Sequence, residues 1–124
     1  MSNPTLLKNM TAGAAINQFR IVKFSAAETM ILAAAATDNM MGVCNEVSPA
    51  ANERFDVVLE GIAFVEAGAA FAFGAPITSD AVGRGVTAAP AAGVNNRVIG
   101  FAMEAATAAG DVVRVLLQPG FMQG

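Results

Sequence analysis

Few side chains in this sequence have the chemistry for acid–base, nucleophilic or metal-assisted catalysis. Histidine is absent and Cys44 is the only cysteine, which excludes a Ser-His-Asp triad, a Cys-His pair and the usual zinc sites. Cys44 has no basic neighbour, and the nearest charge, Glu46, disfavours a thiolate. The ten Asp and Glu residues form no recognisable pair for general acid–base work. We therefore expect no enzymatic activity, no catalytic residue, no cofactor and no metal.

Three short segments are similar to functional motifs, but each has a simpler structural explanation. Residues 80–85 are glycine-rich like an anion-binding loop, yet they lack the P-loop lysine and a following helix, which favours a turn. Residues 101–105 are similar to the hairpin tip of biotin carriers, but Glu104 occupies the position of the modified lysine. Met40 and Met41 are candidates for a methionine-rich contact, although core packing is the favoured interpretation.

The size and composition indicate one folded domain that is a subunit of something larger. A chain of 124 residues buries about two-thirds of its unfolded surface, enough for a core without disulfides or metals. Hydrophobic residues make up 55% and charged residues 14%, against about 25% charged residues in typical domains. Because so few charges are present, much weakly apolar surface must stay exposed, and such surface usually meets a partner.

Charge and hydropathy exclude several other partners. The net charge is −3 and the seven Lys and Arg residues are scattered, so no basic patch is available for direct nucleic-acid binding. The longest apolar run, residues 30–36, is far shorter than the ~20 residues of a membrane span. The first residues lack the pattern of a signal peptide, so we expect synthesis in the cytoplasm and no membrane association.

Hydrophobic patterning predicts an all-β fold, either a small β-barrel or a sandwich. Strand-like runs recur about every 8 to 12 residues with turn signals between them. Gly61 marks a bulge or bend, and Pro76 confines its strand to an edge or a strand start. Residues 26–36 and 101–109 also contain good helix formers; the second is interpreted as strand and turn, and the first is open to a helical turn. The expected strands are 19–24, 29–33, 40–47, 55–60, 62–65, 74–78, 86–88, 97–104 and 111–117.

These patterns divide the chain into a flexible N-terminal arm (1–18), a single β domain (19–118) and a C-terminal tail (119–124). The arm is polar apart from Leu6, Leu7, Met10 and Ile16, too few apolar groups for a core of its own. We expect these four residues to bind a partner, with the arm adding a strand to a partner's sheet edge.

Five segments between Phe55 and Gln118, most of them rich in glycine and alanine, carry a resemblance to a known family. They are Leu59-Glu60-Gly61, Ala67-Gly68-Ala69-Ala70, Gly74-Ala75-Pro76-Ile77, residues 98–106 and residues 110–117. In their arrangement the sequence resembles the small capsid cement, or head decoration, proteins of tailed bacteriophages.

The resemblance implies a structural role without catalytic residues. Such proteins are β-rich and often trimeric, bind the outer surface of the expanded capsid and stabilise the mature shell against the pressure of packaged DNA. The implied partners are the major capsid protein and other copies of this chain, with a homotrimer favoured over a dimer. The implied location is the outer capsid surface of the virion.

Two alternatives remain open from the residues alone. One is another structural virion protein, such as a shell or tail-tube subunit, which would polymerise by itself. The other is a small β-barrel that binds a ligand or carbohydrate. Sugar sites usually stack a ring on Trp or Tyr, both absent here, and most of the eight Phe residues fall in strand-like runs expected to be core.

Overall fold

The protein is an all-β fold, which confirms the predicted fold class. The computed structural model describes the backbone of residues 3–124 and the side chains of residues 6–124, and no helix occurs within this part. Residues 26–36 accordingly form a strand end, a turn and one complete short strand, and residues 101–109 form a strand end and turns. Nothing among the described residues forms an apolar helix long enough to traverse a membrane. The strands are β1 (Asn3–Ala12), β2 (Arg20–Ala26), β3 (Thr29–Leu32), β4 (Met40–Cys44), β5 (Arg54–Glu66), β6 (Pro76–Ser79), β7 (Gly85–Thr87), β8 (Asn95–Ala102) and β9 (Val112–Gln123).

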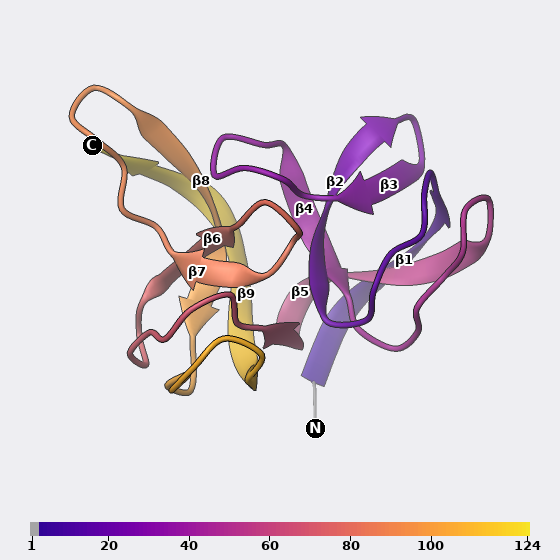
Figure 1. The fold of residues 1–124 in the computed structure, drawn as a ribbon. Coiled ribbons are helices and arrows are strands. Elements are labelled where there is room, and N and C mark those ends of the chain that lie inside the picture. Colours follow the sequence, from indigo (N-terminus) through magenta and orange to yellow (C-terminus); the bar gives the residue numbers. More distant parts are fainter. Residues whose placement is uncertain (1–2) are drawn as a thin grey trace.

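Five strands close into a barrel, at the right of Figure 1. They are hydrogen-bonded in the order β1-β3-β2-β4-β5, and β1 also pairs with β5, which completes the ring. The β1–β5 ladder is long and antiparallel, whereas the parallel β1–β3 contact consists of Thr11 opposite Thr29 and Ala12 opposite Met30. The barrel interior contains Met10, Ala12, Ile16, Val22, Met30, Cys44, Phe55 and Val57.

The second half of the molecule is a sheet that shares β5 with the barrel. Its order is β5-β9-β8-β6-β7, and it lies at the left of Figure 1. The transition occurs at Gly61, whose φ is +96°: Val58 still pairs with β4, while β9 pairs with β5 from Gly61 onward. The predicted irregularity at Gly61 therefore lies within one continuous strand. Pro76 is the first residue of β6, one of the two predicted placements.

A second hydrophobic core lies between the barrel wall and this sheet. Val43 pairs with Val58, and Cys44 pairs with Val57; the first pair belongs to the second core and the second pair to the barrel interior. Because alternate residues of β4 and β5 face different cores, both faces are apolar at this point. Burial on both faces explains why the sequences of β4 and β5 contain apolar runs without a clear alternation of apolar and polar residues.

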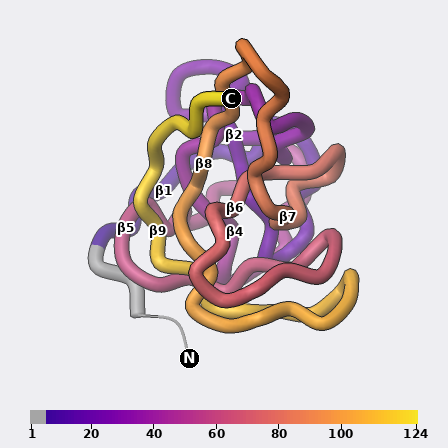
Figure 2. Tube along the Cα trace, turned by 90° about the vertical axis from the view of Figure 1, so that its left-hand side faces the viewer, coloured from indigo at the N-terminus to yellow at the C-terminus, as the bar shows by residue number. Residues whose placement is uncertain are grey.

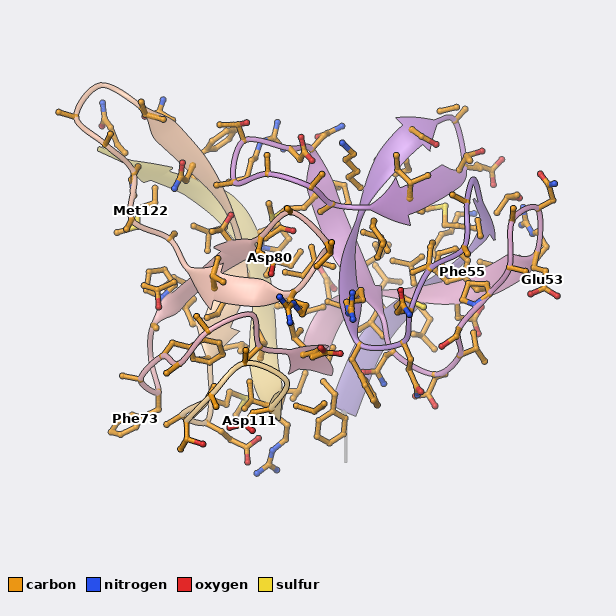
Figure 3. The ribbon with its side chains drawn as sticks, in the orientation of Figure 1. Glu53, Phe55, Phe73, Asp80, Asp111 and Met122 are labelled. Carbon is orange, nitrogen blue, oxygen red and sulfur yellow. The ribbon has the colours of Figure 1, made fainter. Side chains whose placement is uncertain are left out.

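The turn after β6 fastens the sheet to the barrel. The Asp80 carboxylate accepts the backbone N–H groups of Val82 and Arg84, and the N–H of Ile21 in β2 donates to the carbonyl oxygen of Gly83 at 2.7 Å. Asp80 accordingly lies between the two halves in Figure 3. The segment is a turn, as favoured from the sequence. The Asp80 carboxylate already accepts the hydrogen bonds from the N–H groups that a bound anion would need.

Both ends of the chain differ from the predicted arm and tail. Within the predicted arm, residues 3–12 form β1 and pair with residues 54–62 of β5; residues 1 and 2 lie outside the described part. At the other end, β9 continues through the predicted tail to Gln123, which pairs with Asn95 of β8. The regular β structure therefore extends beyond the predicted domain of residues 19–118.

Candidate interaction surfaces

The four residues predicted to bind a partner lie in two different environments. Met10 and Ile16 are 4% and 2% exposed and pack inside the barrel. Leu6 and Leu7, near the start of β1, are 46% and 45% exposed. In this conformation only Leu6 and Leu7 are accessible, because the pairing of β1 with β5 directs Met10 into the protein's own core.

The first half of β1 has an open backbone edge. The N–H of Thr11 donates to the carbonyl of Glu28, and β1–β3 pairing is confined to Thr11 and Ala12. Alternation directs the backbone groups of Leu7 and Asn9 to the same side, ahead of the start of β3, and the Asn9 carbonyl there also accepts a hydrogen bond from Nη2 of Arg54 at 3.4 Å. An ion pair between Lys8 and Glu28, 3.7 Å long, borders this edge. The β1 edge, defined as residues 6–9, therefore has the geometry to accept a strand.

A larger apolar surface lies on the outer side of the second sheet. Leu116 of β9 is opposite Ile62 of β5 on one side and Phe101 of β8 on the other. Figure 2 shows β9 between β5 and β8. The N–H of Met103 donates to the backbone of Arg114, which extends the β8–β9 contact past the end of β8. We name the exposed apolar side chains of this region the sheet face: Phe101, Met103, Val112 and Leu116.

One ion pair lies within the sheet face. The Glu104 carboxylate accepts two hydrogen bonds from Arg114, one from Nη2 at 3.1 Å and one from the backbone N–H at 2.8 Å. The side-chain bond from Arg114 lowers the pKa of Glu104, and the same bond raises the pKa of Arg114. The two charges neutralise each other within the apolar surroundings.

The far ends of β8 and β9 form a two-stranded ribbon that projects at the upper left of Figure 1. Phe121 is 70% exposed on this ribbon, and the Arg97 guanidinium lies 4.7 Å from the centre of its ring. Met122 is at the same end in Figure 3, well separated from Phe73. The ribbon is therefore a second, smaller exposed apolar site.

The side chains with catalytic potential are dispersed or buried. Cys44 lies inside the barrel, where burial raises the pKa of its thiol to about 11, and its Sγ donates to the carbonyl of Val47 at 3.0 Å. Among residues whose side chains are described, no cluster of three Cys, Asp or Glu residues is arranged to hold a metal ion.

Comparison with known proteins identifies the family. A family model described as phage cement protein matches residues 2–117. The chain belongs to the phage cement protein family. This result confirms the resemblance predicted from residues 55–118 and extends it to β1. A comparison with curated proteins found no significant match.

The cement protein is also similar to a solved structure, the head fiber gp8.5 N base in bacteriophage phi29. The two share 19% sequence identity with a TM-score of 0.68, over 91% of this chain and 93% of that one. At this identity the likeness shows a common fold. Family membership gives the cement protein a structural, capsid-associated role in the phage virion.

The sheet face was not predicted from the sequence, although one signal for it exists. Val113, Val115 and Leu117 are buried, and Arg114 is exposed. A charged residue in an apolar strand marks the outward side, so Arg114 places its neighbours at i±2, Val112 and Leu116, on the surface. No comparable charge marks Phe101.

Proposed function

We propose that this cement protein binds the outer surface of the capsid and stabilises the mature shell against the internal pressure of packaged DNA. The observation that carries the proposal is the cement-family match over residues 2–117. The exposed apolar surfaces of the barrel and sheet support it, because a capsid-binding protein must present such surface to its partners.

The proposed attachment site is the β1 edge, with the major capsid protein as the partner. An extended segment of the capsid protein would pair with the open backbone of residues 6–9 and cover Leu6 and Leu7. Main-chain hydrogen bonds provide affinity in this mode of binding, and the side chains beside the added strand provide specificity. Met10 and Ile16 support the site from inside the barrel rather than by contact.

Stabilisation follows if the protein binds the expanded shell more tightly than any other capsid state. A ligand that prefers one state shifts the equilibrium toward it in proportion to its binding free energy. We propose that several copies act together as a homo-oligomer, a trimer rather than a dimer, since linked sites multiply weak individual contacts.

The test uses phage heads prepared without this protein. Purified protein should bind mature heads to saturation, should not bind unexpanded heads, and should raise the temperature at which packaged DNA is released. The double variant Leu6→Glu with Leu7→Glu should lose binding. The matched control Val47→Glu, equally exposed on the barrel side, should bind normally.

Two outcomes would contradict the proposal. Full occupancy on mature heads without any change in DNA release would remove the stabilising role. Polymerisation of the purified protein without heads would instead indicate a shell or tail-tube subunit.

A further inference from the structure

We propose that the sheet face is buried against a second copy of this chain, while the β1 edge is left for the capsid protein. The inference rests on the proposed function, because it assigns one surface to each partner of a cement oligomer. Its basis is the composition and charge of the four-residue sheet face and its distinctness from the β1 edge.

The sheet face has the properties of an interface core. Phe101 and Leu116 are directly opposite on β8 and β9, and they are 40% and 42% exposed, while Met103 is 48% exposed. Aromatic residues, Met and Arg are enriched in protein interfaces, and charged residues are depleted from interface cores. Antiparallel pairing holds Phe101, Val112 and Leu116 on their strands, so little conformational entropy is lost when they are covered.

Electrostatics favours another copy of the chain as the occupant. The sheet face contains one cation and one anion, Arg114 and Glu104, which are already paired. Copies arranged around a threefold axis therefore approach one another through this face without net repulsion, and Arg114 of one copy can bond Glu104 of the next. The chain as a whole carries a net charge of −3, which opposes close approach through most other surfaces.

Two carboxylates at the border of the sheet face are paired within the chain as well. Glu66, opposite Val112 on β5, bonds the Arg20 guanidinium at 3.3 Å. The Asp111 carboxylate accepts the backbone N–H and the hydroxyl of Thr107, both at 2.9 Å. When a second copy buries the sheet face, these carboxylates consequently need no new partner. A buried charge without a hydrogen-bonded partner would oppose association.

The test is self-association of the purified full chain, measured by sedimentation at several micromolar concentrations. The variant Leu116→Glu places a carboxylate at the centre of the sheet face and should weaken self-association by about tenfold or more, because burial of an unpaired charge is costly. Val47→Glu introduces the same charge on an equally exposed residue away from the sheet face and should associate like the unchanged protein. Circular dichroism establishes that each variant is folded.

Met103→Glu provides a second probe at the end of β8 if Leu116→Glu fails to fold. The charge exchange Glu104→Arg with Arg114→Glu gives an independent readout. Each single reversal should weaken association, and the double variant should restore it. Unchanged association of all these variants, or a wild-type chain that is monomeric both free and on heads, would overturn the inference.

Head binding separates this inference from the proposed function. If the chain associates through the sheet face but does not bind heads, the inference stands and the cement role fails. If Leu116→Glu, Val47→Glu and the wild type have the same mass and all bind heads, the cement role stands and the inference fails. Loss of head binding by Leu116→Glu without any change in its mass would assign the sheet face to the capsid protein.

Discussion

Gly83 and Gly93 have the same backbone conformation in different surroundings, which makes them a matched pair. Their φ angles are +80° and +79°. A Cβ on Gly83 would lie 2.9 Å from the carbonyl oxygen of Ile21, whereas a Cβ on Gly93 meets nothing within 4 Å. Gly93→Ala should therefore cost only the left-handed strain, about 1 kcal/mol. Gly83→Ala should cost about 2–3 kcal/mol, because the turn must also move away from β2.

Chemical denaturation of the two variants measures this difference directly. Both substitutions reduce the flexibility of the unfolded chain equally, so the difference reports on the close contacts of residue 83 with Ile21, Leu32 and Arg20. Equal losses of unfolding free energy would mean that the turn containing Gly83 is not held firmly against the barrel.

Cys44 should behave as a packing residue. Since burial raises the pKa of its thiol to about 11, we expect no reaction with thiol reagents at neutral pH until the protein unfolds. Cys44→Ala should cost on the order of 1 kcal/mol, and a reductant should leave melting temperature and head binding unchanged. The unfolded thiol loses its proton near pH 8.5, so the stability that Cys44 contributes below that pH should diminish toward about pH 11. Loss of assembly in reductant would instead indicate an intersubunit disulfide.

At the level of elements, we expect β1 to be part of the folding unit rather than a dispensable arm. It closes the barrel through its ladder with β5 and contributes Met10 and Ala12 to the interior. Deletion of residues 2–12 should therefore destabilise the protein by more than about 3 kcal/mol, since truncation of a single buried methionine typically costs 2–5 kcal/mol. The domain division predicted from the sequence implies the opposite, a truncated chain that melts normally. Thermal melting of the truncated protein distinguishes the two expectations.

The strands predicted correctly were those with clear periodicity or uninterrupted apolar runs. β1 was missed because register shifts on both sides of Leu6 disrupt the period of two and because Asn9 and Thr11 are polar. On the outward side of β1, Arg54 donates hydrogen bonds to the side chains of Asn9 and Thr11. The end of β9 was missed because Pro119 is typical of a chain that leaves a sheet. β1 and the end of β9 form because they pair with segments distant in the sequence, and the local residue pattern does not predict such pairing.

For the whole molecule, the difficulty in predicting the binding surfaces has a common physical cause. Exposure of Leu6 and burial of Met10 follow from which strand β1 pairs with and in which register. The strands that line two cores are apolar on both faces. The sequence therefore does not distinguish an exposed side chain such as Phe101 from a buried one. Composition alone correctly indicated that apolar surface must be exposed, because 14% charged residues cannot cover a domain of this size.

Acid should weaken the whole fold, because the carboxyl groups with shifted pKa values are all shifted in the same direction. Burial would raise the pKa of Asp38, but the bonds from Lys23 and the Ala34 N–H, with the charge of Lys23, bring it below its ordinary value. Hydrogen bonds from Arg114 and Thr107 lower the pKa values of Glu104 and Asp111. A depressed carboxyl pKa stabilises the folded state above the unfolded pKa of about 4, and that contribution is lost as the pH falls through the folded value. The melting temperature should accordingly be nearly constant near neutral pH and should fall below about pH 4.

Asp38→Asn tests whether Asp38 is the barrel carboxyl group whose protonation causes the acid-induced loss of stability. Asp38 is only 20% exposed at its side chain and bonds Lys23 at 2.9 Å, so the variant should lose about 1–2 kcal/mol at pH 7, a decrease of roughly 4–8 °C in melting temperature. Since an amide does not titrate, the further loss between pH 5 and pH 2.5 should be smaller than in the wild type. Glu28→Gln is the control: Glu28 pairs with Lys8 at 3.7 Å on the exposed rim, where an ion pair contributes about 0–1 kcal/mol. An acid-induced loss as large in Asp38→Asn as in the wild type would mean that the contact between Asp38 and Lys23 does not hold the 34–38 loop to β2, and that acid acts elsewhere in the fold.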